Sequence, residues 1–314
     1  MTGRPAGPTS TPGPLLPGPP LAPEAAARRL NLEVARRLDG LLHGDHPGFL
    51  PGPGSEPAEA RAYSPGDDVR RIDWAVTART GQAHVRSTVA ERELETTLLV
   101  DLSASMSFGT ANAEKRDVAL ALSAAFLHLT SRPGDRTGAL TLTGEGLRVL
   151  PARSGRAASV GTLTALLRTP RSTGPGPGLA HALTALSARP RRRGLTVVVG
   201  DLLQPVGEWA RPLRLLALRH DVIVCQVVDR RELRLPAAGV LSLVDPATGR
   251  QLQVRTTPKV RERYAEAARA RAGEQAAAVR AAPAGHLVVH TEHDWLPQLA
   301  RFLTTRHRTR GRVG

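Results

Sequence analysis

From about residue 84 to the C-terminus, short apolar runs alternate with longer stretches whose apolar residues recur at helical spacing. The runs predict strands at 98–100, 138–142, 195–200, 222–228 and 286–290. The stretches predict helices at 114–130, 156–168, 179–188, 206–218, 259–281 and 294–305. Hairpin strands are expected at 147–150 and at the pair 240–244 and 251–254. Because apolar strands separated by helices are typical of parallel sheets, the pattern predicts an α/β fold with a mostly parallel sheet and helices on both faces.

The N-terminal part of the chain follows a different pattern. Residues 1–20 are rich in Pro and Gly, which predicts a disordered lead. Leu30, Val34 and Leu38 recur at helical spacing, which predicts one amphipathic helix over 23–43. We therefore expect three parts: the lead at 1–20, an N-terminal helix with an extended clamp segment at 21–85, and the α/β domain at 86–314.

The chain is strongly basic, with a net charge of +15 over 314 residues. This charge raises the hypothesis of nucleic-acid binding. However, Lys occurs only at 115 and 259, so the charge follows a general bias toward Arg. Aromatic residues are only 3% of the chain, which argues against a surface that stacks bases. Specific nucleic-acid binding is therefore the least favoured of three functional hypotheses.

The single cysteine, Cys225, excludes internal disulfides and a cysteine-based zinc site. It lies in an apolar run, so we expect a core thiol. No stretch is long and apolar enough for a membrane span, and the N-terminus lacks the pattern of a secretory signal. The sequence therefore predicts a cytoplasmic protein.

Two loops that follow buried strands carry candidate chemistry. Asp101, Ser103 and Ser105 form an Asp-x-Ser-x-Ser loop after the first strand of the domain, and Asp201 follows the strand at 195–200. Ligands of open α/β sheets bind at the carboxyl ends of the strands. Carboxylate and hydroxyl oxygens suit Mg²⁺, and Mn²⁺ is an alternative. The sequence thus predicts a metal site made by Asp101, Ser103, Ser105 and Asp201; the competing interpretation is that these side chains only bond the turn.

This arrangement resembles the metal-ion-dependent adhesion site of von Willebrand factor A domains. In that family an Asp-x-Ser-x-Ser loop is followed by a Thr and a later Asp, and the bound metal accepts a carboxylate from a partner. Here the position of the Thr is occupied by Pro177, which has no hydroxyl. Ser172 and Thr173 are the candidates to supply one.

A second group of motifs lies at residues 61–92. The sequence Ser64-Pro-Gly-Asp67 is typical of a turn, and the charges that follow surround Ile72 and Trp74. We expect these charges to pair where the segment packs on the main domain, with Trp74 as an anchor in the core. The residues that make up this signature are Tyr63, Pro65, Gly66, Asp67, Asp68, Arg71, Asp73, Trp74, Arg79, Glu91 and Arg92.

Together with the run from Asp101 to Met106, these residues resemble domain-of-unknown-function family 58, whose members are von Willebrand A-like (Rossmann-like) proteins associated with MoxR-type AAA+ ATPases. Lys115 also falls where the family tends to place a Lys. The resemblance implies a bacterial, non-enzymatic adaptor or chaperone-like protein. Its implied partners are a MoxR-type ATPase and an unknown client protein, engaged through the metal site.

A metal-dependent hydrolase using Asp101 and Asp201 is the main alternative. Such sites usually contain more carboxylates, and no catalytic residues stand out in the sequence. The chain has no phosphate-binding loop of the P-loop type, so we expect no nucleotide cofactor. His290 and His293 lack a clear third ligand, and we interpret them as ordinary residues.

Overall fold

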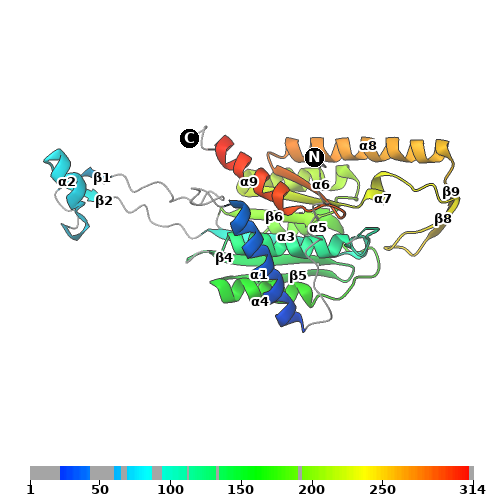
Figure 1. Cartoon of the computed structure of the whole chain (residues 1–314), viewed down its shortest axis with the longest axis horizontal. Coiled ribbons are helices and arrows are strands. Elements are labelled where there is room, and N and C mark those ends of the chain that lie inside the picture. The colour runs from blue at the N-terminus through cyan, green and yellow to red at the C-terminus, as the bar shows by residue number, and fades with distance from the viewer. Residues whose placement is uncertain are drawn as a thin grey trace, which may run out of the picture.

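The computed structural model describes residues 22–42, 60–64, 69–86, 94–111, 113–131, 134–189 and 193–310. The predicted disordered lead at 1–20 lies outside these residues. Most of the described chain forms one sheet with helices packed on it (Figure 1).

The sheet has six strands in the order β10-β7-β6-β3-β4-β5. Their bounds are β3 Glu95–Asp101, β4 Arg136–Thr143, β5 Gly146–Ser154, β6 Leu195–Gly200, β7 Asp221–Val228 and β10 Gly285–His290. All neighbours pair in parallel except β4 and β5, which form an antiparallel hairpin at one edge. The predicted mostly parallel sheet is therefore confirmed.

Alternate residues of the central strands pack into two separate cores because successive side chains of a strand point to opposite faces. Leu98 and Val100 belong to the core under one set of helices, and Leu99 belongs to the other core. The first set is α1 Pro23–Leu42, α3 Lys115–Leu129, α4 Arg156–Leu167 and α9 Leu296–Arg310. The second set is α5 Gly178–Ser187, α6 Val206–Arg219 and α8 Pro258–Ala281. The prediction of helices on both faces is confirmed, including the N-terminal amphipathic helix.

Residues 60–64 and 69–86, called the 60–86 unit below, form a small unit with elements that the sequence pattern did not predict. It contains β1 Ala60–Ala62, η1 Val69–Arg71, α2 Trp74–Thr80 and β2 His84–Arg86, with β1 and β2 paired antiparallel. Figure 1 shows β1, α2 and β2 lying apart from the sheet. The short helix α2 has no buried residue.

Within this unit, the expectation that Trp74 anchors the core is wrong. Trp74 is the first residue of α2, and its side chain is 72% exposed. Asp73 caps the helix by accepting hydrogen bonds from the N–H groups of Ala75 and Val76, at 3.1 and 3.2 Å. A seven-residue helix beside a two-stranded ribbon offers too little apolar surface to enclose an indole. The local sequence therefore starts a helix at Trp74 without burying it.

The single cysteine is a core thiol, as expected. Cys225 is fully buried in β7, and burial raises the pKa of its thiol far above the usual range.

Among the helices described, none has the length and apolar character that a bilayer crossing requires.

Candidate functional site

Three neighbouring strands end in carboxylates at the same edge of the sheet. Asp101 is the last residue of β3, Asp201 directly follows β6, and Asp229 directly follows β7. The order β7-β6-β3 makes these strands adjacent, and the chain continues from β3 to β4 on one side and returns to β6 on the other. A topological switch point of this kind is where open α/β sheets bind ligands. The sheet therefore brings Asp101 and Asp201 together as predicted.

The Asp101 loop is held in a tight conformation by its own polar groups. Ser103 donates its backbone N–H to Asp101 Oδ1 at 2.9 Å, and the hydroxyl oxygens of Ser103 and Ser105 lie 3.3 Å apart. Residues Ala104–Met106 form the short helix η2. A Cβ atom on Gly200 would lie 3.0 Å from Asp101 Cβ, so the close approach of β6 to the loop depends on glycine.

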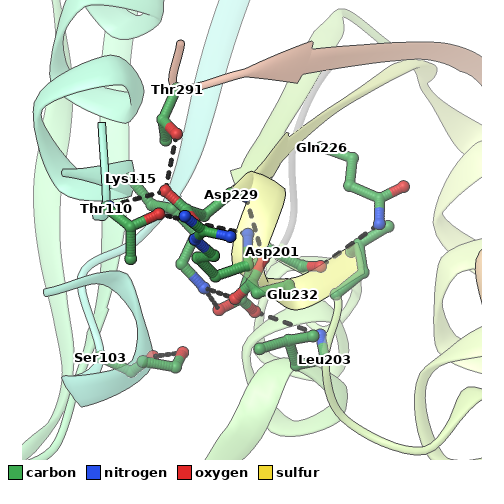
Figure 2. Close-up of polar contacts among 12 residues, drawn as sticks. Ser103, Thr110, Lys115, Asp201, Leu203, Gln226, Asp229, Glu232 and Thr291 are labelled. Carbon is green, nitrogen blue, oxygen red and sulfur yellow. Dashed lines mark hydrogen bonds and ion pairs between the residues drawn. The ribbon is translucent and has the colours of Figure 1, made fainter. Parts of the chain in front are cut away.

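Lys115 is the cation of the site, and its function was not predicted from the sequence. This residue begins α3, and its side chain is completely buried. Its ammonium donates to Asp201 Oδ2 at 2.8 Å and to Glu232 Oε1 at 2.5 Å (Figure 2). Burial alone would lower the pKa of Lys115, but the charges of Asp201 and Glu232 outweigh it and raise the pKa. The amine therefore remains protonated and links the end of β6 to the segment after β7.

Asp229 and Glu232 come from one short motif after β7. Asp229 caps the four-residue helix α7 Arg230–Leu233, and Glu232 accepts the N–H of Asp229 in return. Asp229 also accepts hydrogen bonds from the hydroxyls of Thr110 and Thr291, at 2.6 and 2.8 Å (Figure 2). An Asp followed three residues later by Glu is the spacing of a capping box, and it could have revealed this turn in the sequence.

A buried amide network supports the loop after Asp201. The Gln226 side chain donates to the carbonyl of Asp201 at 3.4 Å and to Gln275 at 2.9 Å. Gln275 in turn donates to the carbonyl of Leu202 at 2.7 Å. Leu202 has a φ of 55°, a left-handed conformation that is costly for a branched side chain. The surrounding bonds therefore fix a strained turn beside the site.

The polar groups at the strand ends border a cavity of about 800 Å³. Ser103, Ser105, Lys115, Asp201 and Glu232 lie on its sheet side. The rest of the lining is largely apolar and includes Phe108, Leu235, Tyr264 and residues of the hairpin strand β8 Val240–Val244. The site is thus a pocket with a polar floor and apolar walls, the usual composition of a ligand-binding cavity.

Burial and nearby charge change the acidity of the carboxyls. Burial, together with the charge of Asp201, raises the pKa of Asp101 to about 7 despite its hydrogen bonds from Ser103. Burial also raises the pKa of Glu232, against the opposing effect of Lys115. Asp229 behaves differently: burial opposes ionisation, but the hydrogen bonds from Thr110, Arg231 and Thr291 hold its pKa below the usual value.

The predicted metal ligands fit a divalent cation in part. Asp101, Ser103 and Ser105 offer hard oxygen atoms from one loop, and a cation there would relieve the buried carboxyl. Asp201 is already paired with Lys115, so direct ligation by Asp201 would compete with this ion pair. Among the residues that the structure describes, no group of three or more His, Cys, Asp or Glu side chains is arranged to hold a metal ion.

The two candidates for the missing threonine, Ser172 and Thr173, have different surroundings in the structure. The side chain of Ser172 is buried, and its hydroxyl donates to the carbonyl of Leu102 at 2.8 Å. Thr173 is exposed, and Pro177 stands at the N-cap of α5. Of the two candidates, Ser172 therefore reaches the Asp101 loop and supports its backbone.

The signature at 61–92 is only partly covered by the structure. Pro65, Gly66, Asp67, Asp68, Glu91 and Arg92 lie outside the described residues. Tyr63 donates its N–H to the carbonyl of Ala83 at 2.8 Å, and Asp73 donates its N–H to the carbonyl of His84 at 2.8 Å. The described part of the signature thus organises the 60–86 unit, while the charge network expected with Glu91 and Arg92 stays a prediction.

Residues 59–274 match the model of a family described as "Protein of unknown function DUF58", and the chain belongs to this family. The uncharacterized proteins Rv1480 of Mycobacterium tuberculosis and Mb1516 of Mycobacterium bovis are each 46% identical to it over 285 residues, 90% of either chain. Among solved structures, BatB from Bacteroides thetaiotaomicron is similar over 68% of this chain and 99% of its own, with 13% identity and a TM-score of 0.45. The VWA domain of SpRpn10 covers 66% of this chain and 94% of its own, with 13% identity and a TM-score of 0.38.

Proposed function

We propose that this protein is a non-enzymatic partner-binding protein, an adaptor that works with a MoxR-type AAA+ ATPase on a client protein. The observation that carries the proposal is the convergence of three strand ends on an open pocket whose charged floor is already paired. Lys115 pairs with both Asp201 and Glu232 within the protein, and both Asp201 oxygens accept a hydrogen bond, from Lys115 and from the N–H of Leu203. Such a floor suits recognition better than turnover.

Asp101, Ser103 and Ser105 would hold Mg²⁺ or Mn²⁺, with Asp201 contributing directly or through a water. The cation would offer a partner carboxylate a point of attachment. Asp101 is the residue on which this contact depends because it is the one carboxylate of the loop.

Isothermal titration of Mg²⁺ and Mn²⁺ tests the metal site. We expect heat of binding with the wild-type chain and none with Asp101→Ala. Asp245→Ala is the matched control, because Asp245 borders the same pocket but its carboxylate is tied up in the hairpin turn by Ala247 and Thr248. Negligible heat in all three proteins would contradict the metal site.

Capture by an immobilised MoxR-type ATPase from the same organism tests the adaptor function. We expect the wild-type chain and Asp245→Ala to be retained and Asp101→Ala to be retained less. No capture of the wild-type chain, with or without nucleotide and Mg²⁺, would contradict the proposal. The hydrolase alternative is tested in parallel with phosphatase and nuclease substrates. Mg²⁺-dependent hydrolysis by the wild-type chain that Asp101→Ala abolishes would favour a hydrolase over an adaptor.

A further inference from the structure

The hairpin beside the pocket has an open strand edge. Strand β8 Val240–Val244 pairs with β9 Gln251–Arg255, and in the part of the chain described β9 is the one strand that pairs with it. Residues Leu241 to Val244 border the pocket, whereas no residue of β9 does. The edge of β8 that faces away from β9 therefore lies along the cavity.

The register of the hairpin shows which backbone groups this edge presents. The backbone N–H of Thr256 donates to the carbonyl of Gly239 at 2.7 Å, and the backbone N–H of Asp245 donates to the carbonyl of Arg250 at 2.9 Å. Hydrogen-bonded and non-hydrogen-bonded pairs alternate in an antiparallel ladder. Since Gly239 and Asp245 belong to hydrogen-bonded pairs, every second residue between them does too. The remaining residues, Val240, Ser242 and Val244, direct their N–H and C=O groups away from β9, to the edge beside the pocket.

The other walls of the pocket match an extended apolar segment. Phe108, Leu235, Pro236 and Tyr264 also line it. The charged side chains on its lining nearly balance, with Lys115 and Arg231 against Asp201, Glu232 and Asp245. A highly charged ligand such as a nucleic acid gains little binding energy from such a lining. An uncharged chain with apolar side chains fits it better. Five residues of β8 span roughly 17 Å, which is the length of a short added strand.

We infer that an extended, apolar segment of a partner protein binds this pocket by adding a strand to β8. The backbone groups of Val240, Ser242 and Val244 pair with the segment, and alternate side chains of the segment enter the apolar walls. This inference rests on the proposed partner-binding function and identifies the recognition mode of the same site. It does not depend on a bound cation, so the two ideas fail separately.

A phage-displayed library of peptides about seven residues long, selected against the full wild-type chain, provides the probe. Selected peptides are then titrated against two proline variants at directly opposed positions of the hairpin. Ser242→Pro removes an N–H at the pocket edge, and Gln253→Pro removes the matching N–H at the outer edge of β9. Proline is tolerated at outward-facing positions of edge strands, so both variants keep the β8–β9 ladder. We expect Ser242→Pro to weaken binding by about tenfold or more and Gln253→Pro to leave it unchanged.

Peptides with N-methylated backbones give a second readout that needs no change in the protein. Methylation of alternate peptide bonds should abolish binding, and methylation of the intervening ones should not, because only one edge of an added strand faces β8. The inference is overturned if no peptide is selected, if Ser242→Pro binds as well as wild type, or if methylation has no alternating effect. It is also overturned if the wild-type chain is a dimer that Ser242→Pro dissociates, since the occupant of β8 is then a second copy. Loss of ATPase capture in Asp101→Ala tests the proposed function and leaves these outcomes untouched.

Discussion

The two segments whose sequence motifs stand out differ sharply in burial. The loop from Asp101 to Met106 is packed at the end of a central strand, and the side chains of Leu102 and Met106 are fully buried. In the 60–86 unit, Val69 and Trp74 are 60% and 72% exposed, and α2 has no buried residue. The first segment is therefore fixed by packing of the fold that carries it. The second is organised by local turns and caps, and its largest side chain, Trp74, is exposed to solvent.

The buried region should respond most strongly to the loss of its cation. Lys115→Met removes the partner of Asp201 and Glu232 and leaves both carboxylates buried, which should lower the free energy of unfolding by about 3–5 kcal/mol. Urea unfolding followed by circular dichroism measures this loss. Lys259→Met is the control because Lys259 is exposed on α8. A loss below about 1 kcal/mol in Lys115→Met would show that the ion pairs contribute little.

The same substitution at two tryptophans tests the comparison directly. Trp209 is fully buried in α6, where its indole also donates to the carbonyl of Gln204 at 3.1 Å. Trp209→Ala should cost about 3–5 kcal/mol of unfolding free energy, since it empties a large volume in the core. Trp74→Ala should change it by no more than about 0.5 kcal/mol, because the indole has little packing to lose.

Thermal and urea unfolding of the two variants give the measurement. A large loss in Trp74→Ala would mean that its indole is covered in solution, and the contrast between the two regions would fail. An unchanged stability together with reduced capture by the ATPase would instead assign Trp74 to a contact with a partner.

The pH dependence of stability should depend on Asp101. Its pKa is about 7 in the folded protein, against 3.8 in the unfolded chain, so the folded state holds a proton that the unfolded state releases. The free energy of unfolding should therefore fall as the pH rises from about 4 to about 7, by an amount on the order of a few kcal/mol. Asp101→Asn should make this fall smaller, while the raised pKa of Glu232 preserves a part of it. Unfolding in urea with EDTA present compares the two proteins. If the unfolding free energies of the wild-type chain and Asp101→Asn changed with pH in the same way, Asp101 would be ionised in the folded protein over this pH range.

The sequence predicted the sheet, its helices and the meeting of Asp101 with Asp201 because each rests on local periodicity and on the rule that parallel strands end at one edge. It did not predict the ion pairs of Lys115, whose partners lie 86 and 117 residues away in the chain. Pairing over such a separation depends on how strands are ordered, which no local pattern encodes. The expectation for Trp74 failed for a different reason. An aromatic residue among charges is typical of a core anchor, but the unit that carries Trp74 offers too little apolar surface to enclose its indole.

The smallest effects that we expect concern Ser172 and Thr173, the two candidates for the threonine that the predicted metal site lacks. Ser172→Ala removes the hydroxyl that donates to the buried carbonyl of Leu102, and an unsatisfied carbonyl should cost about 1–3 kcal/mol of unfolding free energy. Thr173→Ala changes an exposed side chain and should cost about 0.5 kcal/mol or less. The two variants are compared by urea unfolding and by the heat of Mg²⁺ binding. If Thr173 supplied a ligand, its loss would reduce that heat while leaving stability intact, whereas the loss of Ser172 would loosen the Asp101 loop and reduce both.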